Sequence, residues 1–240
     1  MLETAVVKSD RRLVLKEKNE IEVALVYYRV MYDPSQFLPN EEASWRLRLE
    51  IETSKAIKCP SIGYQLSGVK KFQQVVKDRK VLEKLLPTVS PAMIDSLSST
   101  FAGLWSLDSD EVVKEALENS INYVMKPQRE GGGHNYYGQE IVDVLGPISN
   151  SPSRKAFILM QKINSLEIDN ILIGRDIDPV EGHVDSVTCE LGIFGSILAT
   201  DKNNVLFNNE DGHVLRCKKI GVNEGGISAG FGAIDSPFLY

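Results

Sequence analysis

The sequence predicts a mixed α/β (α+β) protein, and three observations favour this class. Segments in which apolar residues recur with helical spacing occupy most of residues 41–120. From residue 123 on, segments rich in β-branched and aromatic residues alternate with turns that contain Gly and Asn. The composition, 42% apolar and 25% charged, is ordinary for a globular protein of 240 residues. This order of elements predicts a sheet covered on one side by helices, or two lobes joined near residues 65–85.

Helices are expected where helical spacing lies between suitable start and stop residues. The tract 41–56 is amphipathic and is stopped by Cys59-Pro60, and the tract 66–86 ends before Pro87. Residues 90–120 hold two or three more helices, whose first residues are Ser or Asp. These side chains suit an N-cap because they accept hydrogen bonds from the unpaired N–H groups of a first helical turn. The expected helices are 41–56, 66–86, 90–105, 108–120 and 138–145.

Strands are expected in short runs of β-branched and aromatic residues. Residues 21–28, IEVALVYY, favour a buried strand because almost every position is apolar. The other expected strands are 122–126, 156–163, 183–199, 205–209 and 213–219.

The charge balance and the cysteines argue against several classes of protein. The chain has 27 basic and 33 acidic residues, and a formal charge of −6 gives no global case for binding nucleic acid. Cys59, Cys189 and Cys217 are widely spaced, which argues against a disulfide framework and a zinc site and favours buried, inert thiols in a reducing compartment. The sequence shows neither a signal peptide nor an apolar stretch of membrane-spanning length. We therefore expect a cytoplasmic protein without a membrane partner.

A glycine triplet in the segment 126–138, KPQREGGGHNYYG, is the most unusual local feature. No Lys-Ser/Thr follows the glycines, as it would in a P-loop, and the spacing is not the G-x-G-x-x-G of dinucleotide-binding folds. Residues without a Cβ still let backbone N–H groups approach a polyanion closely. Lys126 could then supply a point charge to phosphates, and Glu130 could hold a bridging Mg²⁺. A surface hairpin loop with solvated charges is an equally good interpretation.

Polar residues elsewhere give weaker indications of a site. Glu190 interrupts an apolar strand, so its carboxylate needs a partner such as a ligand hydroxyl, an Arg or a Lys. Arg216 and Lys218 alternate along a strand and would point to one face, either as an anion site or as a solvated edge. Lys70-Lys71 is better interpreted as a solvated helix face. The histidines lack the spacing of metal ligands and are expected in turns or at the surface: His134, His183 and His213.

Several motifs occur in the same order as in one known family. They are KPQREGGG followed by N-x-Y-G at 126–138, ILMQKI at 158–163, CELGIFG at 189–195, GHVLRCK at 212–218 and GGISAG at 225–230. With these motifs the chain resembles eukaryotic-type glutathione synthetase, an ATP-grasp ligase. The resemblance implies an ATP-grasp fold with part of an α/β substrate-binding domain. Residues 1–68 would be the remainder of that domain, and residues 69–240 would be the ATP-binding portion.

The resemblance also implies a reaction. It is the ligation of γ-glutamylcysteine with glycine, with ATP as co-substrate and Mg²⁺ as cofactor, through an acyl phosphate and in a homodimer. The family chain is roughly twice as long, so this sequence resembles a C-terminal portion, a truncated product or a shortened paralogue. The alternative function is that of a non-catalytic relative that binds nucleotide or dipeptide, or that pairs with a full-length subunit. An acceptor other than glycine also stays open.

Carried over to the matching positions, the resemblance implies a nucleotide site. Lys70 and Lys126 would contact phosphates, the backbone of residues 160–163 would read adenine, and Glu190 would take the ribose hydroxyls. Glu130 would be the metal ligand. The residues implied in ATP binding are Lys70, Lys126, Gln128, Gly131, Gly132, Gly133, Asn135, Tyr137, Met160, Gln161, Lys162, Ile163, Glu190, Lys218 and Glu224.

A substrate site is implied in the same way. Arg216 would hold a substrate carboxylate and act in catalysis with Lys126, and the loops 126–138 and 221–232 would close over ATP and dipeptide. The family's substrate loop usually reads Arg-Asp-Gly-Tyr, whereas residues 29–32 read Arg-Val-Met-Tyr, which removes an acid and a glycine. Glu224 replaces a common Asp and Ser228 a common Ala. The implied substrate residues are Arg29, Val30, Met31, Tyr32, Arg216, Ile227 and Ser228.

Overall fold

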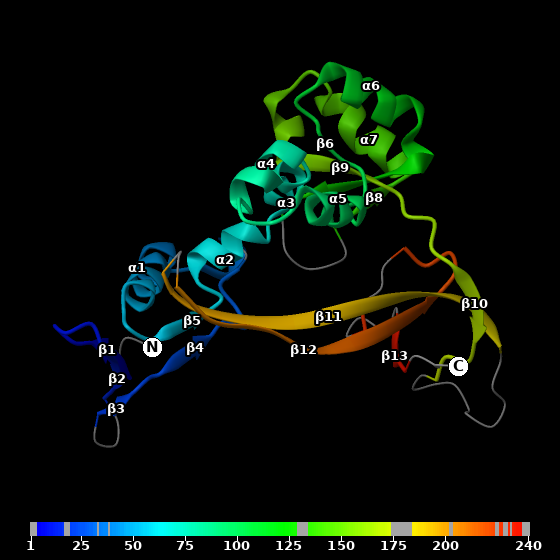
Figure 1. Ribbon diagram of the computed structural model, residues 1–240. Coiled ribbons are helices and arrows are strands. Elements are labelled where there is room, and N and C mark those ends of the chain that lie inside the picture. The colour runs from blue at the N-terminus through cyan, green and yellow to red at the C-terminus, as the bar shows by residue number, and fades with distance from the viewer. Residues whose placement is uncertain are drawn as a thin grey trace. The chain divides into compact units, whose positions relative to one another are not determined.

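The computed structural model divides the chain into two units, Met1–Lys162 and Ile163–Tyr240 (Figure 1). It describes residues 4–16, 20–32, 34–37, 39–128, 134–173, 184–201, 204–223, 226–227, 230 and 232–236. The first unit holds the described helices together with short strands, and the second unit is built from strands. The boundary predicted at residue 68 concerns a different division of the chain and stays a prediction.

The first unit begins with two small sheets. Strands β1 (Ala5–Val7), β2 (Leu13–Leu15) and β3 (Ile21–Glu22) form an antiparallel sheet in that order. Strand β4 (Leu25–Tyr27) pairs in parallel with β5 (Ile57–Cys59), and the connection between them contains the short 3-10 helix Pro34–Phe37 and helix α1 (Glu41–Glu52). A parallel pair joined by a crossover helix is the usual βαβ arrangement.

The buried strand expected at 21–28 is wrong. The segment forms two short strands, β3 and β4, and the side chains of Ile21, Leu25 and Tyr27 are exposed. In the β4–β5 pair, Leu25 lies beside Ile57 on one face, which is exposed on both strands, while Val26 on the opposite face is half-buried. The run is apolar on both faces, but a single pair of strands buries one face only partly.

Helices α2 (Ile62–Ser67), α3 (Lys70–Val76) and α4 (Arg79–Leu85) replace the single helix expected at 66–86. The chain breaks at Gly68, which caps the end of α2, and at Asp78, whose carboxylate accepts a hydrogen bond from the N–H of Lys80 at 2.8 Å. Helix α1 ends at Glu52, four residues before its expected end, because residues from Ile57 on pair with β4.

Serine caps are confirmed at both later helices. Ser90 accepts a hydrogen bond from the first turn of α5 (Pro91–Ser99), and Ser109 does the same for α6 (Asp110–Glu118). Helix α7 (Gln139–Ile148) begins at Gly138, whose φ of +48° is in the left-handed region that favours glycine.

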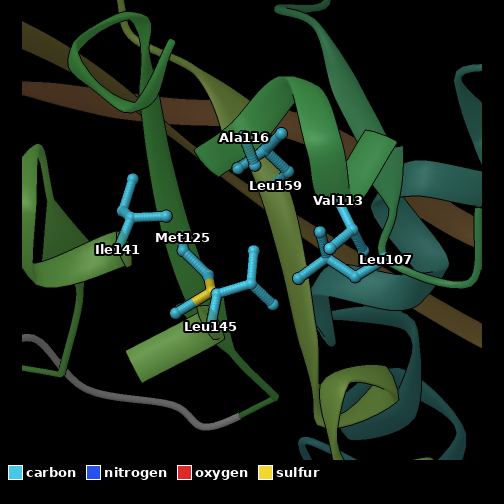
Figure 2. Packing of buried hydrophobic residues seen from close by; sticks show 7 residues of the cluster. All are labelled: Leu107, Val113, Ala116, Met125, Ile141, Leu145 and Leu159. Atoms are coloured by element: carbon cyan, nitrogen blue, oxygen red, sulfur yellow. The ribbon is translucent and has the colours of Figure 1, made fainter. Parts of the chain in front are cut away.

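The main sheet of the first unit has the strand order β6-β9-β7-β8, and all its pairings are antiparallel. The strands are β6 (Leu104–Ser106), β9 (Phe157–Gln161), β7 (Tyr123–Pro127) and β8 (Tyr136–Tyr137). Helices α6 and α7 pack on one face of this sheet, where a buried apolar cluster forms the core (Figure 2). The cluster consists of Leu107, Val113, Ala116, Met125, Ile141, Leu145 and Leu159.

The second unit is an antiparallel sheet with the order β10-β11-β12-β13. Its strands are β10 (Glu167–Asn170), β11 (Asp185–Asp201), β12 (Asn204–Lys219) and β13 (Ala233–Asp235). The strands expected at 205–209 and 213–219 join into β12, which passes through Gly212 at a φ of +147°. Among the residues that the structure describes, no helix is long and apolar enough to cross a bilayer.

Candidate nucleotide and substrate site

The face of the main sheet opposite the core carries several of the residues expected to bind ATP. Val124 pairs directly with Met160 on β9 and with Tyr137 on β8. Directly paired residues project to the same side, and side chains alternate along a strand, so Lys126 shares this face with Met160 and Tyr137. The neighbouring residue Met125 lies in the core on the other side. The register therefore brings together three positions that are 11 and 23 residues apart in sequence.

Helix α3 is held against the ends of two strands of this sheet. The backbone N–H of Lys71 donates to Oε1 of Gln128 at 2.9 Å, just beyond the end of β7. The Nζ of Lys71 donates to the hydroxyl of Ser106 at 2.8 Å and lies 3.3 Å from Oδ2 of Asp108. Lys71 is thus bonded to Ser106 and Asp108 while its side chain stays 45% exposed, so the expectation of a solvated helix face holds for it only in part. Lys70 is the first residue of α3, directly before Lys71, and forms no ion pair with any described residue.

The Asp108 carboxyl gives this contact a defined pH dependence. The Ser106 hydroxyl, followed by Lys71, lowers the pKa of Asp108 to about 2, below the ordinary value near 3.9. Because the shift is downward, the interaction is complete above pH ~4 and is lost as the pH falls through about 2. We expect a carbon-13 titration of the Asp108 carboxyl to show this low midpoint, and Lys71→Met to raise it. A midpoint that is the same in both proteins would contradict this role of Lys71.

The segment expected to read adenine has part of its backbone already engaged. The N–H of Gln161 donates to the carbonyl of Gly103 at 2.8 Å, and the N–H of Lys162 donates to the carbonyl of Asn122 at 2.9 Å. The Gln161 side chain accepts from the N–H of Gly103 at 3.0 Å. Strand β9 ends at Gln161, and Ile163 is the first residue after it whose N–H forms no hydrogen bond with a described residue.

In the second unit, Glu190 and Arg216 are direct cross-strand partners and form an ion pair. The expectation that Glu190 has a partner is confirmed, but its side chain is 66% exposed and is therefore not buried in the strand. An ion pair so exposed contributes about 0–1 kcal/mol, so a ligand could replace either partner at small cost. Lys218 shares this face of β12 with Arg216, and its Nζ donates to the carbonyl of Asn223 at 2.9 Å.

The residues expected in the substrate loop lie at the edge of an aromatic groove of about 390 Å³. It is lined by Tyr28, Val30, Tyr32, Pro60, Tyr64, Gln65 and Gly68. The backbone N–H groups of Met31 and Tyr32 both donate to Oε1 of Gln36, at 2.6 and 3.1 Å, which fixes the loop. Arg29 is exposed beside the groove.

Sequence reasoning missed three residues at this groove. Tyr28 and Tyr64 line it, and the guanidinium of the buried Arg48 stacks 3.6 Å from the centre of the Tyr28 ring. Burial raises the pKa of Tyr28. The signal that could have identified Arg48 is an Arg on the buried face of an amphipathic helix, because a charge at such a position requires partners.

Met31 adopts a backbone conformation that favours glycine. Its φ is +68°, and a non-glycine residue in the left-handed region costs about 1–2 kcal/mol. We expect Met31→Gly to raise the free energy of unfolding by a few tenths to about 1 kcal/mol, because the strain released exceeds the extra chain entropy of glycine. Urea unfolding would measure it. Val30→Gly, at an exposed neighbour with no such φ, is the matched control and should be neutral or destabilising.

The thiols and imidazoles were only partly predicted. His134 and His213 are exposed, as expected, and His183 lies outside the described residues. Cys59 is exposed, so the expectation of a buried thiol is wrong there, whereas Cys217 is buried. Within the described part of the chain, no group of three or more His, Cys, Asp or Glu side chains is arranged to hold a metal.

Comparison with known proteins decides the family. The model of the eukaryotic glutathione synthase ATP-binding domain matches residues 4–239. The chain belongs to the eukaryotic glutathione synthase family. It is 42% identical over 219 residues to the chloroplastic glutathione synthetase of Solanum lycopersicum, and 41% identical over 233 residues to the glutathione synthetase of Homo sapiens. These matches cover 90% and 95% of this chain but 38% and 47% of the relatives, so the chain spans less than half of their length.

A solved structure has a similar fold. The apo form of a glutathione synthetase-like effector from Globodera pallida matches with a TM-score of 0.69 and 24% identity, over 100% of this chain and 46% of that one. The mixed α+β, ATP-grasp fold expected from the sequence is confirmed.

The glutathione synthase residues of this chain divide into those that the structure describes and those that it does not. Asn135, just before β8, and Tyr137, within it, are half-buried, and Ile227 is exposed. The positions outside the described residues are Glu130, Gly131, Gly132, Gly133, Glu224 and Ser228. Their roles stay predictions.

Proposed function

We propose that this chain supplies the ATP-binding half of a glutathione synthetase. The reaction joins γ-glutamylcysteine to glycine and converts ATP to ADP and phosphate. The observation that carries the proposal is the shared sheet face of Lys126, Tyr137 and Met160, with Gln128 at the end of β7 bonded to Lys71, the neighbour of Lys70. A cation and a phenol ring on one sheet face suit a triphosphate joined to an adenosine.

The proposed chemistry is phosphoryl transfer followed by acyl transfer. The cysteinyl carboxylate of γ-glutamylcysteine attacks the γ-phosphorus, the bond to ADP breaks, and an acyl phosphate forms. The amine of glycine then attacks the acyl carbon and releases phosphate. Lys126 and Lys70 would neutralise charge on the phosphate oxygens, and Arg216 would orient a substrate carboxylate. Lys218 would contact the nucleotide, and Glu190 would exchange its partner Arg216 for the ribose hydroxyls.

A magnesium ion would depend on Glu130 and on phosphate oxygens of ATP. One described acid near this end of the sheet, Asp108, is already paired with Lys71 and Lys155, so it does not offer a free carboxylate. One carboxylate plus phosphate oxygens is a donor set that Mg²⁺ accepts. Bound there, the cation would offset negative charge on the phosphates.

The proposal also assigns roles to two loops and to two parts of the chain. The loops 126–138 and 221–232 would close over ATP and dipeptide and protect the acyl phosphate from water. Residues 1–68, with Arg29, Val30, Met31 and Tyr32, would belong to the substrate-binding domain, and residues 69–240 to the ATP-binding portion. We further propose a homodimer in the cytoplasm, which sedimentation and cell fractionation would test.

The test is an assay of the purified chain with ATP, Mg²⁺, γ-glutamylcysteine and glycine. We expect ADP and glutathione in equal amounts, measured by coupled oxidation of NADH and by mass spectrometry. Omitting glycine should abolish glutathione while leaving ATP binding intact. No binding of ATP in a calorimeter would refute the proposed nucleotide site.

A non-catalytic binder is the second candidate, and the Glu190–Arg216 pair favours it. In this ion pair, the two side chains assigned to ribose and to substrate neutralise each other. ATP binding without release of ADP would support this candidate over the ligase.

A ligase with a different acceptor is the third candidate, favoured by Val30 and Met31 in place of the family's acid and glycine. β-Alanine or serine in place of glycine would then give the larger turnover.

A further inference from the structure

Cys189 and Cys217 lie directly opposite each other on neighbouring strands of the second unit. They are register partners in the antiparallel pair β11–β12, and their Sγ atoms are in contact at 2.6 Å, while both remain free thiols. Directly opposed residues in antiparallel strands have Cα atoms about 4.5 or 5.5 Å apart, and both values lie inside the range that a disulfide spans. The register is therefore compatible with a covalent link at this position.

The surroundings of the two thiols differ. Cys217 is buried with its Sγ 3.3 Å from Oδ2 of Asp235, whereas Cys189 is half-buried and closer to solvent. The Asn170 amide donates to the same Asp235 oxygen at 2.5 Å and so fixes the carboxylate. Burial, followed by Cys189, raises the pKa of Cys217. Cys189 is thus the thiol that a small oxidant reaches first, and Cys217 is the neighbouring thiol that can then attack the oxidised Cys189 sulfur.

We propose that Cys189 and Cys217 form a reversible cross-strand disulfide when the protein meets a hydroperoxide. The Cys189 thiol loses its proton and the thiolate attacks the peroxide, so that an S–O bond forms and the O–O bond breaks, giving a sulfenic acid. The hydroxide that leaves takes up the proton from the thiol and departs as one water. The Cys217 sulfur then attacks the Cys189 sulfur, the S–O bond breaks, and the departing hydroxide takes the Cys217 proton as a second water. Two thiols are oxidised by two electrons and one peroxide is reduced.

The position of the pair links this modification to the proposed substrate site. Glu190 follows Cys189 and Arg216 precedes Cys217, and these two residues form the next cross-strand pair, on the other face of the sheet. A covalent bond between the neighbouring positions restrains the local opening of the β11–β12 hairpin. Formation of this disulfide does not depend on the proposed ligase activity, because it requires only the pairing of β11 with β12.

The test is peptide mapping of the folded full chain after exposure to hydrogen peroxide. Cleavage after glutamate places the three cysteines in separate peptides: 53–83 with Cys59, 182–190 with Cys189, and 211–224 with Cys217. We expect a linked pair 182–190 and 211–224 that has lost two hydrogen masses and that dithiothreitol separates. Hydrogen exchange should show amides of Glu190 and Arg216 protected about tenfold or more in the oxidised protein.

Variants separate this pair from general thiol oxidation. Cys59→Ser, which removes the exposed thiol, should leave the link unchanged. Cys217→Ser should abolish it and leave a sulfenic acid on Cys189 that dimedone traps, with circular dichroism confirming the fold. The proposal is overturned if both thiols of the wild-type protein remain open to alkylation after peroxide, or if the link joins Cys59. Oxidation of Cys189 to sulfinic acid without a link would overturn it equally.

Discussion

If Lys126 contacts a phosphate as proposed, we expect its replacement with methionine to lower the affinity of the chain for magnesium–ATP by about 10–150-fold. A hydrogen bond between an ammonium group and a phosphate contributes about 1.5–3 kcal/mol, and 1.4 kcal/mol is a factor of ten. Methionine keeps most of the apolar stem of this half-buried side chain, so the substitution removes the charge with little loss of packing. Isothermal titration with ATP and Mg²⁺ measures the effect.

The matched control for this prediction is Lys114→Met. Lys114 lies exposed on α6, and its Nζ is 3.8 Å from Glu118 in the same helix. The two variants carry the same change of charge, so a loss confined to Lys126→Met identifies a local contact rather than a change in the overall field. Equal affinities in the two variants would remove Lys126 from the phosphate site.

Alternation along single strands could be predicted from the sequence, whereas register between strands could not. Arg216 and Lys218 were expected on one face because they are two residues apart, and both belong to β12. The sequence required a partner for Glu190 but did not select Arg216, because pairing across strands depends on where each strand starts. The pair Cys189–Cys217 was not predicted for the same reason: the two residues are 28 positions apart in sequence, and only the register between strands brings them together.

Helix ends and burial were predicted less well than the existence of the elements. The tract 66–86 has continuous helical spacing, yet Gly68 and Asp78 divide it, because a local cap competes with the extension of a helix. Residues 21–28 are apolar on both faces, which favours a buried strand in any sequence argument. Their exposure depends on what packs against β4, and local composition does not carry that information.

The candidate nucleotide site was predicted through motifs rather than through physical periodicity. Spacing alone left the segment 126–138 divided between a phosphate loop and a surface hairpin. The pairing of Val124 with Met160 and with Tyr137 adds what the motif lacks, since it places residues from three strands on one face. The hydrogen bond from the N–H of Lys71 to the side chain of Gln128 was not predicted, because it joins residues 57 positions apart in sequence.

The opposite face of the same sheet supplies the largest expected effect on stability. Leu145 on α7 is fully buried in the cluster with Met125 and Ile141 (Figure 2). Leu145→Ala removes buried apolar surface and leaves a cavity, so we expect the free energy of unfolding to fall by about 2–5 kcal/mol. Urea unfolding measures the change. The same substitution at Leu85, which is 55% exposed on α4, should cost less than about 1 kcal/mol.

Measuring both unfolding and ATP binding on both variants separates the roles of the two faces of β7. Met125 packs toward Leu145, and Lys126, the next residue, points to the other side. Leu145→Ala should therefore lower stability while the folded fraction binds ATP within about threefold of the wild type, a difference below ~0.7 kcal/mol. Lys126→Met should instead lower ATP binding and leave the free energy of unfolding nearly unchanged. If Leu145→Ala also abolished binding in the folded protein, the core would be setting the geometry of the phosphate site, and the two faces would act as one unit.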